Sequence, residues 1–580
     1  MSHSSTDHFQ SIDEANPAGD SDNPRIDFEL AELTGRQIHR ARQLFAYGGL
    51  DGVMNRPLMH DQGLYPHFAV AANGYELYDS SGQTFVDWIN GWGSIILGHC
   101  HDTVQQAIVD QAKCATSIAL MHPVEIEVAE LVVEMVPNAE MIAFGKNGSD
   151  SLNAAIRIAR AATGRELILQ NGFHGFHDWY TCLHPNVQGV LPALKNYVQP
   201  FPYNDLEALE SLLKQHQGQF AGIVMEPVNL HIPDQGYLQS VKELVHKYGG
   251  VLIWDEVVTA FRLGRGGAQQ YFGVEPDIAV LGKAMGNGLP LSAVVGSAEL
   301  MKHLRRTAYG MTYRGETISL AAANACLRFM KQNDVAGHLE MIGSKLRDRF
   351  HELCQEIDIH CKLSGPSARM SFVFQAQGGL QWQAIRSIFV LECLKNGVLT
   401  NGNILVSYAH DDEAIDRTIL AFEKSLKRVR SAIDASGMGV RTGTEFAFDA
   451  SSVEIKGCVD AVQRSPEQMI ISGWALVDGV VIDGLFAAFE DGTKIKSEIN
   501  PRPDIGEAFP AVENGANAGF KITIPKNSNG ATNVRFRLIG KVGSVERFHC
   551  LVVDETSKPS SKNQPPIKGP HWFRDGVLFI

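Results

Sequence analysis

Two residues of opposite charge follow apolar runs in the middle of the sequence. Lys283 comes shortly after residues 278–281, and Asp255 comes directly after residues 251–254. A lysine that is shielded from water has a lowered pKa, and its neutral amine can attack an aldehyde. A carboxylate such as Asp255 can stabilise a protonated ring nitrogen through a charge-assisted hydrogen bond. Each residue also has an ordinary interpretation, as a solvated lysine and as a turn or helix-cap aspartate.

A glycine- and serine-rich segment, residues 145–151, leads into a stretch with helical periodicity. Gly148 and Ser149 would stand at the start of that helix, where free backbone amides and the helix dipole attract a phosphate. The same sequence is also typical of a plain turn with a helix N-cap. Phe173 and His174 follow another short apolar run, and an aromatic ring there could stack on a planar ligand or belong to the core.

The elements that must position these residues belong to an α/β pattern. Helical stretches alternate with short, continuous apolar runs, which suit parallel strands that are covered on both faces. Ligands of such sheets bind beyond the carboxyl ends of the strands. The sequence therefore predicts a mostly parallel sheet, with Asp255 and Lys283 at the ends of two neighbouring strands.

Composition divides the chain into five expected parts. Residues 1–24 are polar and acidic, which is typical of a disordered tail, and residues 25–432 form the α/β region. Residues 433–450 break the helical periodicity and read as a linker. Short alternating segments predict a β-sandwich over residues 451–555, before a linker and C-terminal tail over residues 556–580.

Three segments illustrate the predicted sandwich strands: residues 469–475, 485–489 and 534–538. Trp474 lies in the first of them. It has two interpretations, as a core tryptophan of the sandwich and as an aromatic platform for a sugar.

The charge argues against several classes of partner, and the cysteine content bears on the cellular compartment. The 580 residues carry a formal net charge of −14, which argues against nucleic acid or an anionic membrane. No apolar run is long enough to span a bilayer, and the N-terminal segment lacks the pattern of a secretory signal. Nine cysteines without CxxC pairs suit a cytoplasmic protein. The tripeptide at residues 99–101 (His-Cys-His) has no second ligand pair, so no metal site is expected.

The segment from Trp254 to Gly296 resembles the signature of the class III aminotransferases. These are pyridoxal 5'-phosphate (PLP) enzymes of fold type I. Residues 91–93 (Gly-Trp-Gly) and 266–269 (Gly-Gly-Ala-Gln) are shared in particular with glutamate-1-semialdehyde aminomutases. The resemblance covers about residues 40 to 430. It implies a large, mostly parallel-sheet domain with a small α+β domain, PLP as cofactor, and a homodimer with shared active sites.

The resemblance also implies a role for each candidate residue. Lys283 would hold PLP covalently and Asp255 would pair with the ring nitrogen, so these two would be catalytic. The implied cofactor-binding set is Gly148, Ser149, Phe173, His174, Glu226, Asp255, Val257, Lys283 and Thr312. Gly148 and Ser149 would bind the phosphate, while Thr312 would reach the phosphate of the neighbouring subunit. Trp92 and Arg56 would contact the substrate.

The substrate half departs from the aminomutase pattern. Arg56 is shifted and Met59 stands at the usual place of the arginine, while the glutamate before residues 407–410 (Ser-Tyr-Ala-His) is missing. Residues 315–317 (Gly-Glu-Thr) replace the usual Gly-Asn-Pro. These departures favour a two-substrate transaminase that uses a small amine donor and an aldehyde or ketone acceptor, in amino-sugar or surface-glycan biosynthesis. The alternatives are a 2,1-aminomutase and a scaffold that binds a glycan or a partner protein.

Overall fold

The computed structural model describes residues 68–80, 82–184, 187–228, 231–310 and 312–434, and the backbone of a helical end and of strands between residues 435 and 553. Arg56 and Met59 lie outside the described residues. The same is true of the two expected tails and of most of the expected linker. Predictions for those segments therefore stay predictions.

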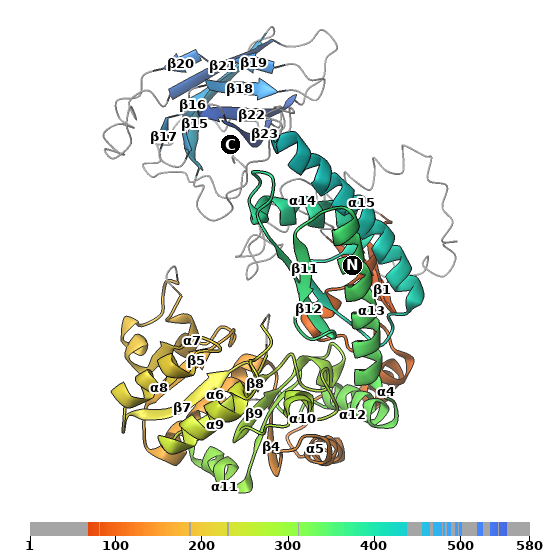
Figure 1. Ribbon diagram of the computed structural model, residues 1–580, viewed down its shortest axis with the longest axis vertical. Coiled ribbons are helices and arrows are strands. Elements are labelled where there is room, and N and C mark those ends of the chain that lie inside the picture. The colour runs from red at the N-terminus through yellow and green to blue at the C-terminus, as the bar shows by residue number, and fades with distance from the viewer. Residues whose placement is uncertain are drawn as a thin grey trace, which may run out of the picture.

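A seven-stranded sheet organises the largest part of the chain, in the order β4-β10-β9-β8-β7-β5-β6 (Figure 1). Its strands are parallel except β10, which is antiparallel to both β4 and β9. The mostly parallel sheet predicted from the apolar runs is confirmed. The strands are β4 (Met141–Gly145), β5 (Leu167–Asn171), β6 (Val198–Pro200), β7 (Phe220–Met225), β8 (Val251–Glu256), β9 (Ile278–Leu281) and β10 (Ser292–Gly296).

Helices cover both faces of this sheet. As a consequence, every side chain along the central strand β8 is buried. Leu252 and Trp254 join the apolar cluster on one face, and Val251 and Ile253 join the cluster on the other. The face of Val251 is packed by α6 (Gly148–Thr163). The other face is packed by α5 (Pro123–Met135), α8 (Leu206–Gln215), α9 (Tyr237–Lys247) and α12 (Thr317–Gln332). Within the described ranges, no helix combines the length and apolar character that a bilayer crossing requires.

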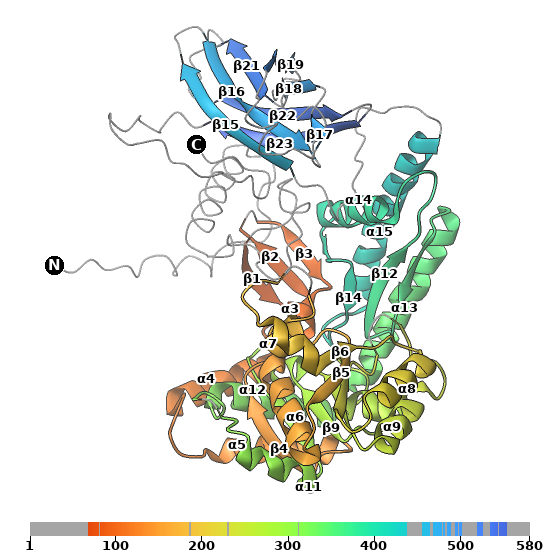
Figure 2. The ribbon, with the colours of Figure 1, turned by 90° about the vertical axis from the view of Figure 1, so that its left-hand side faces the viewer.

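A second, smaller α+β part stands above the central sheet (Figure 2). It contains an antiparallel sheet in the order β11-β12-β14 and a four-stranded sheet in the order β1-β2-β3-β13. Four buried phenylalanines pack edge to face in its core: Phe350, Phe372, Phe389 and Phe422. Its strands are β1 (Ala69–Asn73), β2 (Glu76–Asp79), β3 (Thr84–Asp87), β11 (Cys361–Ser364), β12 (Arg369–Phe374), β13 (Val398–Leu399) and β14 (Asn403–Leu405).

Three long helices belong to the same part: α13 (Val335–Glu356), α14 (Trp382–Lys395) and α15 (Asp412–Gly437). Helix α15 continues past residue 432, where the sequence placed the end of the α/β region. The last turn of α15 could not be predicted because the amphipathic pattern ends in small residues. Ala and Ser are compatible with both a helix end and a linker.

Two antiparallel sheets follow α15, in the orders β15-β16-β21-β20, with β17 beside β16, and β19-β18-β22-β23 (Figure 1). Residues 469–475 and 534–538 fall in β16 and β22, and residues 485–488 of the other illustrative segment fall in β18. The packing of the two sheets as one sandwich stays a prediction. The strands are β15 (Ile455–Arg464), β16 (Gln468–Val477), β17 (Val480–Val481), β18 (Gly484–Ala488), β19 (Lys494–Lys496), β20 (Glu498–Asn500), β21 (Gly519–Pro525), β22 (Val534–Val542) and β23 (Val545–Val553).

Candidate active site

Lys283 follows the carboxyl end of β9 and begins the short 3-10 helix η2 (Lys283–Gly286). Its φ of 42° is left-handed, a conformation that costs a non-glycine residue about 1 kcal/mol or more. Burial and the positive charge of Arg369 lower the pKa of Lys283 to about 8, although Asp255 and Glu226 oppose the shift. Within the described residues, the amine makes no hydrogen bond or ion pair. Lys283 therefore combines a strained backbone with an amine that is shielded from water.

Asp255 lies at the end of β8, the parallel neighbour of β9, and is paired with His174. Nδ1 of the buried His174 lies 2.9 Å from Asp255 Oδ2, and its Nε2 lies 3.0 Å from the carbonyl oxygen of Asn171. Both ring nitrogens thus face oxygen atoms, so the ring is held at both ends. The other carboxylate oxygen, Oδ1, accepts a hydrogen bond from the backbone N–H of Val257. The histidine therefore fixes Asp255 as an oriented carboxylate.

The expected phosphate segment forms the N-terminus of α6. Asn147 is the N-cap and accepts a hydrogen bond from the backbone N–H of Asp150. The amides of Gly148 and Ser149 have no acceptor within the helix, because first-turn amides have none. A Cβ on Gly148 would stand 2.8 Å from Cγ2 of Val257, so only glycine lets the two segments approach this closely. The loop thus offers free amides beside Val257.

Val257 connects the separate pieces of the site. Its methyl groups lie against Gly148 on one side and close to Gly282, which precedes Lys283, on the other. Phe173 is 62% exposed, and its ring meets Tyr180 edge to face. A nucleophilic amine, an oriented carboxylate and an anion-binding helix start fit a phosphate-bearing pyridine with an aldehyde. These residues are the ones that would hold PLP.

Glu226 joins this site to the small part of the molecule. Its Oε1 accepts a hydrogen bond from the backbone N–H of Phe173 at 2.8 Å, and its Oε2 lies 3.3 Å from Nη1 of Arg369. Arg369 Nη1 also donates to the carbonyl oxygen of Val228 at 3.1 Å. A Cβ on Gly172 would stand 2.8 Å from Glu226 Oε1, and φ is +114° there, so this turn needs glycine. Sequence reasoning found Glu226 and missed Arg369.

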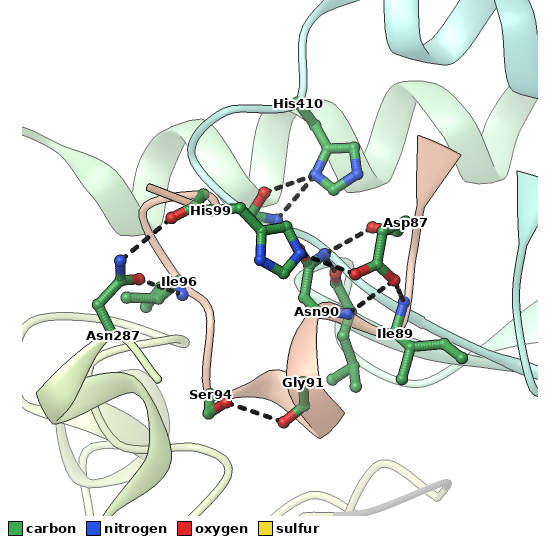
Figure 3. Close-up of polar contacts among 12 residues, drawn as sticks. Asp87, Ile89, Asn90, Gly91, Ser94, Ile96, His99, Asn287 and His410 are labelled. Carbon is green, nitrogen blue, oxygen red and sulfur yellow. Dashed lines mark hydrogen bonds and ion pairs between the residues drawn. The ribbon is translucent and has the colours of Figure 1, made fainter. Parts of the chain in front are cut away.

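Trp92 stands in a tight turn before the central sheet, 48% exposed. Asn90 and Trp92 have φ of 47° and 55°, so the turn is left-handed. Asp87 holds it, because its Oδ1 accepts hydrogen bonds from the backbone N–H groups of Ile89 and Asn90. The Oδ2 atom of Asp87 lies 2.9 Å from Nε2 of His99 (Figure 3). The expected substrate-entry tryptophan therefore sits on a turn that polar contacts define.

Asn287 ties the segment after that turn to the lysine segment. Its Oδ1 accepts hydrogen bonds from the backbone N–H groups of Ile96 and Leu97, both at 2.9 Å, and it follows η2 directly (Figure 3). Nearby, His410 is buried and stacks on Trp88 with ring centroids 3.9 Å apart. Burial lowers the pKa of His410 to about 4, so this ring stays neutral at physiological pH.

Thr312 is exposed, and within the described residues no hydrogen bond joins it to the phosphate loop of its own chain. Glu316, from the Gly-Glu-Thr variant, has a structural role that sequence reasoning missed. It caps α12 by accepting from the backbone N–H groups of Ile318 and Ser319, and it pairs with Lys146 at 2.9 Å. Glutamate there links the start of α12 to the phosphate segment. The described residues contain no cluster of three or more metal-ligating side chains.

Comparison with known proteins agrees with this geometry. The family model described as aminotransferase class-III matches residues 59–423. A curated relative, glutamate-1-semialdehyde 2,1-aminomutase of Roseiflexus castenholzii, is 32% identical over 431 residues, covering 68% of this chain and 99% of that protein. The PLP-containing FumI protein of Sphingopyxis sp. MTA144 matches with a TM-score of 0.65 and 26% identity, over 69% of this chain and 97% of that one.

An omega-transaminase from Sphaerobacter thermophilus matches with a TM-score of 0.62 and 25% identity, over 68% of this chain and 97% of that one. These likenesses confirm PLP fold type I and PLP as the cofactor.

Proposed function

Because the chain belongs to the class III aminotransferase family, we propose that this PLP-dependent enzyme moves an amino group within one substrate, as a glutamate-1-semialdehyde 2,1-aminomutase does. The observation that carries the proposal is the aminomutase relative, because the match covers 99% of that relative and 68% of this chain. This relative supports the alternative of the sequence analysis better than the two-substrate reaction that stood first there. It gives no support to a role in amino-sugar or surface-glycan biosynthesis, so the proposal does not include one.

The residues of the chain divide the work around the cofactor. Bound PLP supplies an electron sink that stabilises negative charge on the substrate carbon. The free amine of Lys283 takes a proton from that carbon at Nζ and returns it at the neighbouring position. Asp255, which His174 orients at 2.9 Å, would pair with the ring nitrogen and favour its protonated form. The amides of Gly148 and Ser149 hold the phosphate.

Three further residues complete the proposed site. Val257 and Phe173 would lie on opposite faces of the ring, and Val257 already lies between the phosphate loop and the lysine segment. Trp92 would border the substrate entry, where its turn presents the side chain to solvent. Arg56, the other expected substrate residue, lies outside the described residues.

A two-substrate transaminase is the second candidate. It is favoured by the transaminase among the structural relatives and by the missing glutamate before residues 407–410. The two reactions differ in one requirement, since a transaminase needs an external amino acceptor to complete its cycle. Incubation with glutamate-1-semialdehyde, with and without an added acceptor, therefore separates them.

We propose that the enzyme is a homodimer. Five exposed apolar side chains gather in two segments that border the α12 start: Ile118, Leu120, Met121, Ile126 and Tyr313. An apolar surface of this kind marks a protein interface more often than a free surface. Thr312 lies next to Tyr313, so the same interface would bring Thr312 to the phosphate site of the partner subunit.

A further inference from the structure

Arg369 is a half-buried arginine whose charge acts on Lys283, and the contacts described above give it no chemical role. It is the first residue of β12, in the small part of the molecule. Its charge reaches Lys283, whose pKa it helps to lower. The side chain is 20% exposed, so solvent reaches it, and its contact with Glu226 connects it to Phe173 of the site.

Within the described residues, the side chain of Arg369 makes its hydrogen bonds through one nitrogen, Nη1. Nη1 donates to Glu226 Oε2 and to the carbonyl oxygen of Val228. Within the described residues, Nε and Nη2 have no acceptor. A guanidinium binds a carboxylate best through two parallel N–H groups, and the Nε–Nη2 edge offers such a pair.

Hydrogen bonds from Arg262 fix the backbone next to Arg369. The fully buried Arg262 donates from Nη1 to the carbonyl oxygens of Ala368 and Val406, and from Nη2 to that of Gly93. The residue directly before Arg369 is therefore fixed against the end of the central sheet. A positioned backbone reduces the entropy that Arg369 loses when it binds an anion.

The local balance of charge favours an anionic ligand near Arg369. Arg262 meets carbonyl oxygens and has no carboxylate partner among the described residues. Glu226 is the carboxylate that Arg369 contacts, and it does so at 3.3 Å through a single nitrogen. A substrate carboxylate at the open edge would add the missing negative charge.

We propose that Arg369 binds the carboxylate of the substrate through its Nε–Nη2 edge, while Glu226 and Val228 hold Nη1. The proposal rests on the proposed function, because it assigns the carboxylate end of that one-substrate reaction. Arg369 then determines specificity: it orients an amino acid-like substrate so that its amine end points toward Lys283. An amine without the carboxylate binds weakly.

The test compares two ligands that differ by one methyl ester, and therefore by the charge of the carboxylate, and that require no turnover. Levulinate carries the carboxylate, and methyl levulinate is its neutral ester. Binding of both to the PLP-loaded enzyme is measured by calorimetry for the wild type, Arg369→Gln, Arg369→Lys and Arg417→Gln. Arg417 is the matched control, since it is a partly exposed arginine paired with a glutamate, Glu76, away from the lysine.

The wild type should bind levulinate about 10- to 100-fold more tightly than the ester, which is the range of a charge-assisted pair. Arg369→Gln should abolish this preference, Arg369→Lys should keep part of it, and Arg417→Gln should keep all of it. A preference that survives in Arg369→Gln, or that is absent from the wild type, overturns the proposal. If Arg369→Gln loses PLP or unfolds at a lower temperature, the Arg369→Lys variant is used instead. A preference for levulinate over the ester that is as large in Arg369→Lys as in the wild type would contradict binding through the Nε–Nη2 edge.

Turnover gives a second readout. Arg369→Gln should raise KM for the carboxylate substrate more than it lowers kcat, because the contact is made in both ground and transition states. A purely structural link between the two parts would weaken acid and ester equally. Failure of the enzyme to convert glutamate-1-semialdehyde would refute the proposed function and leave the levulinate result to decide on Arg369.

Discussion

Nδ1 of His174 lies 2.9 Å from Oδ2 of Asp255, and the opposite ring nitrogen lies 3.0 Å from the carbonyl oxygen of Asn171. The histidine is completely buried and the aspartate nearly so. A buried carboxylate is stable as an anion when charge-assisted donors satisfy it. The contact with His174 and the hydrogen bond that Oδ1 accepts from the backbone N–H of Val257 therefore fix the orientation of Asp255 at the end of β8.

Asp255→Asn should bind PLP but react more slowly, because an amide cannot hold the ring-nitrogen proton through a charge. Loss of a charge-assisted hydrogen bond of about 1.5–3 kcal/mol corresponds to about a 10- to 150-fold fall in kcat. Asp277→Asn is the matched control, since Asp277 pairs with His246 at 3.0 Å at the opposite end of β9. Full kcat in Asp255→Asn would reduce Asp255 to a turn residue.

Lys283→Ala should remain folded and retain PLP without a covalent bond. Borohydride reduction followed by peptide mass spectrometry should add the cofactor mass to the Lys283 peptide of the wild type and to no peptide of the variant. Lys302→Ala removes an exposed lysine and should behave as the wild type does. Normal turnover by Lys283→Ala would refute the assignment of the whole site.

The pH dependence of cofactor capture follows from the pKa of Lys283, which is about 8 instead of 10.5. The neutral amine is the reactive form, and it predominates above the pKa. Stopped-flow mixing of apoenzyme with PLP should therefore show a covalent capture rate that rises toward pH 8 and then levels off. A rate that keeps rising to pH 10 would mean that the lysine is solvated.

Thr312 should act across the subunit boundary. A heterodimer of Lys283→Ala and Thr312→Ala chains contains one site with both residues intact, so mixing and refolding the two inactive variants should restore activity. Lys283→Ala mixed with Asp255→Asn is the control, because both defects then stay in one site each and no intact site forms. Activity that does not recover in the first mixture, or a fully active monomer in sedimentation, would contradict the shared site.

The sequence predicts the parts of the site that depend on one strand end or one helix start. Asp255, Lys283 and the loop at Gly148 follow from apolar runs and helical periodicity, because their places depend on neighbours in the chain. Arg369 could not be found this way. Its partner Glu226 is 143 residues away, directly after β7 of another sheet, and only tertiary packing brings the two together.

Three other features were not predicted from the sequence. The stacking of His410 on Trp88 joins residues from opposite ends of the described region, and no local pattern marks it. Glu316 reads as a departure from a family motif, whereas the structure gives it a helix cap and an ion pair with Lys146. The last turn of α15 escaped because its small residues suit a helix end as well as a linker.

The most direct test of the account is the fate of glutamate-1-semialdehyde when no amino acceptor is present. The purified, cofactor-loaded enzyme is incubated with this compound alone, and 5-aminolevulinate is measured over many turnovers, with Lys283→Ala as the blank. The account predicts continued formation of 5-aminolevulinate that an added keto acid does not accelerate. If no 5-aminolevulinate formed, and the deaminated product 4,5-dioxovalerate appeared once per active site and then increased only when an acceptor was added, the account would be contradicted and a two-substrate transaminase established.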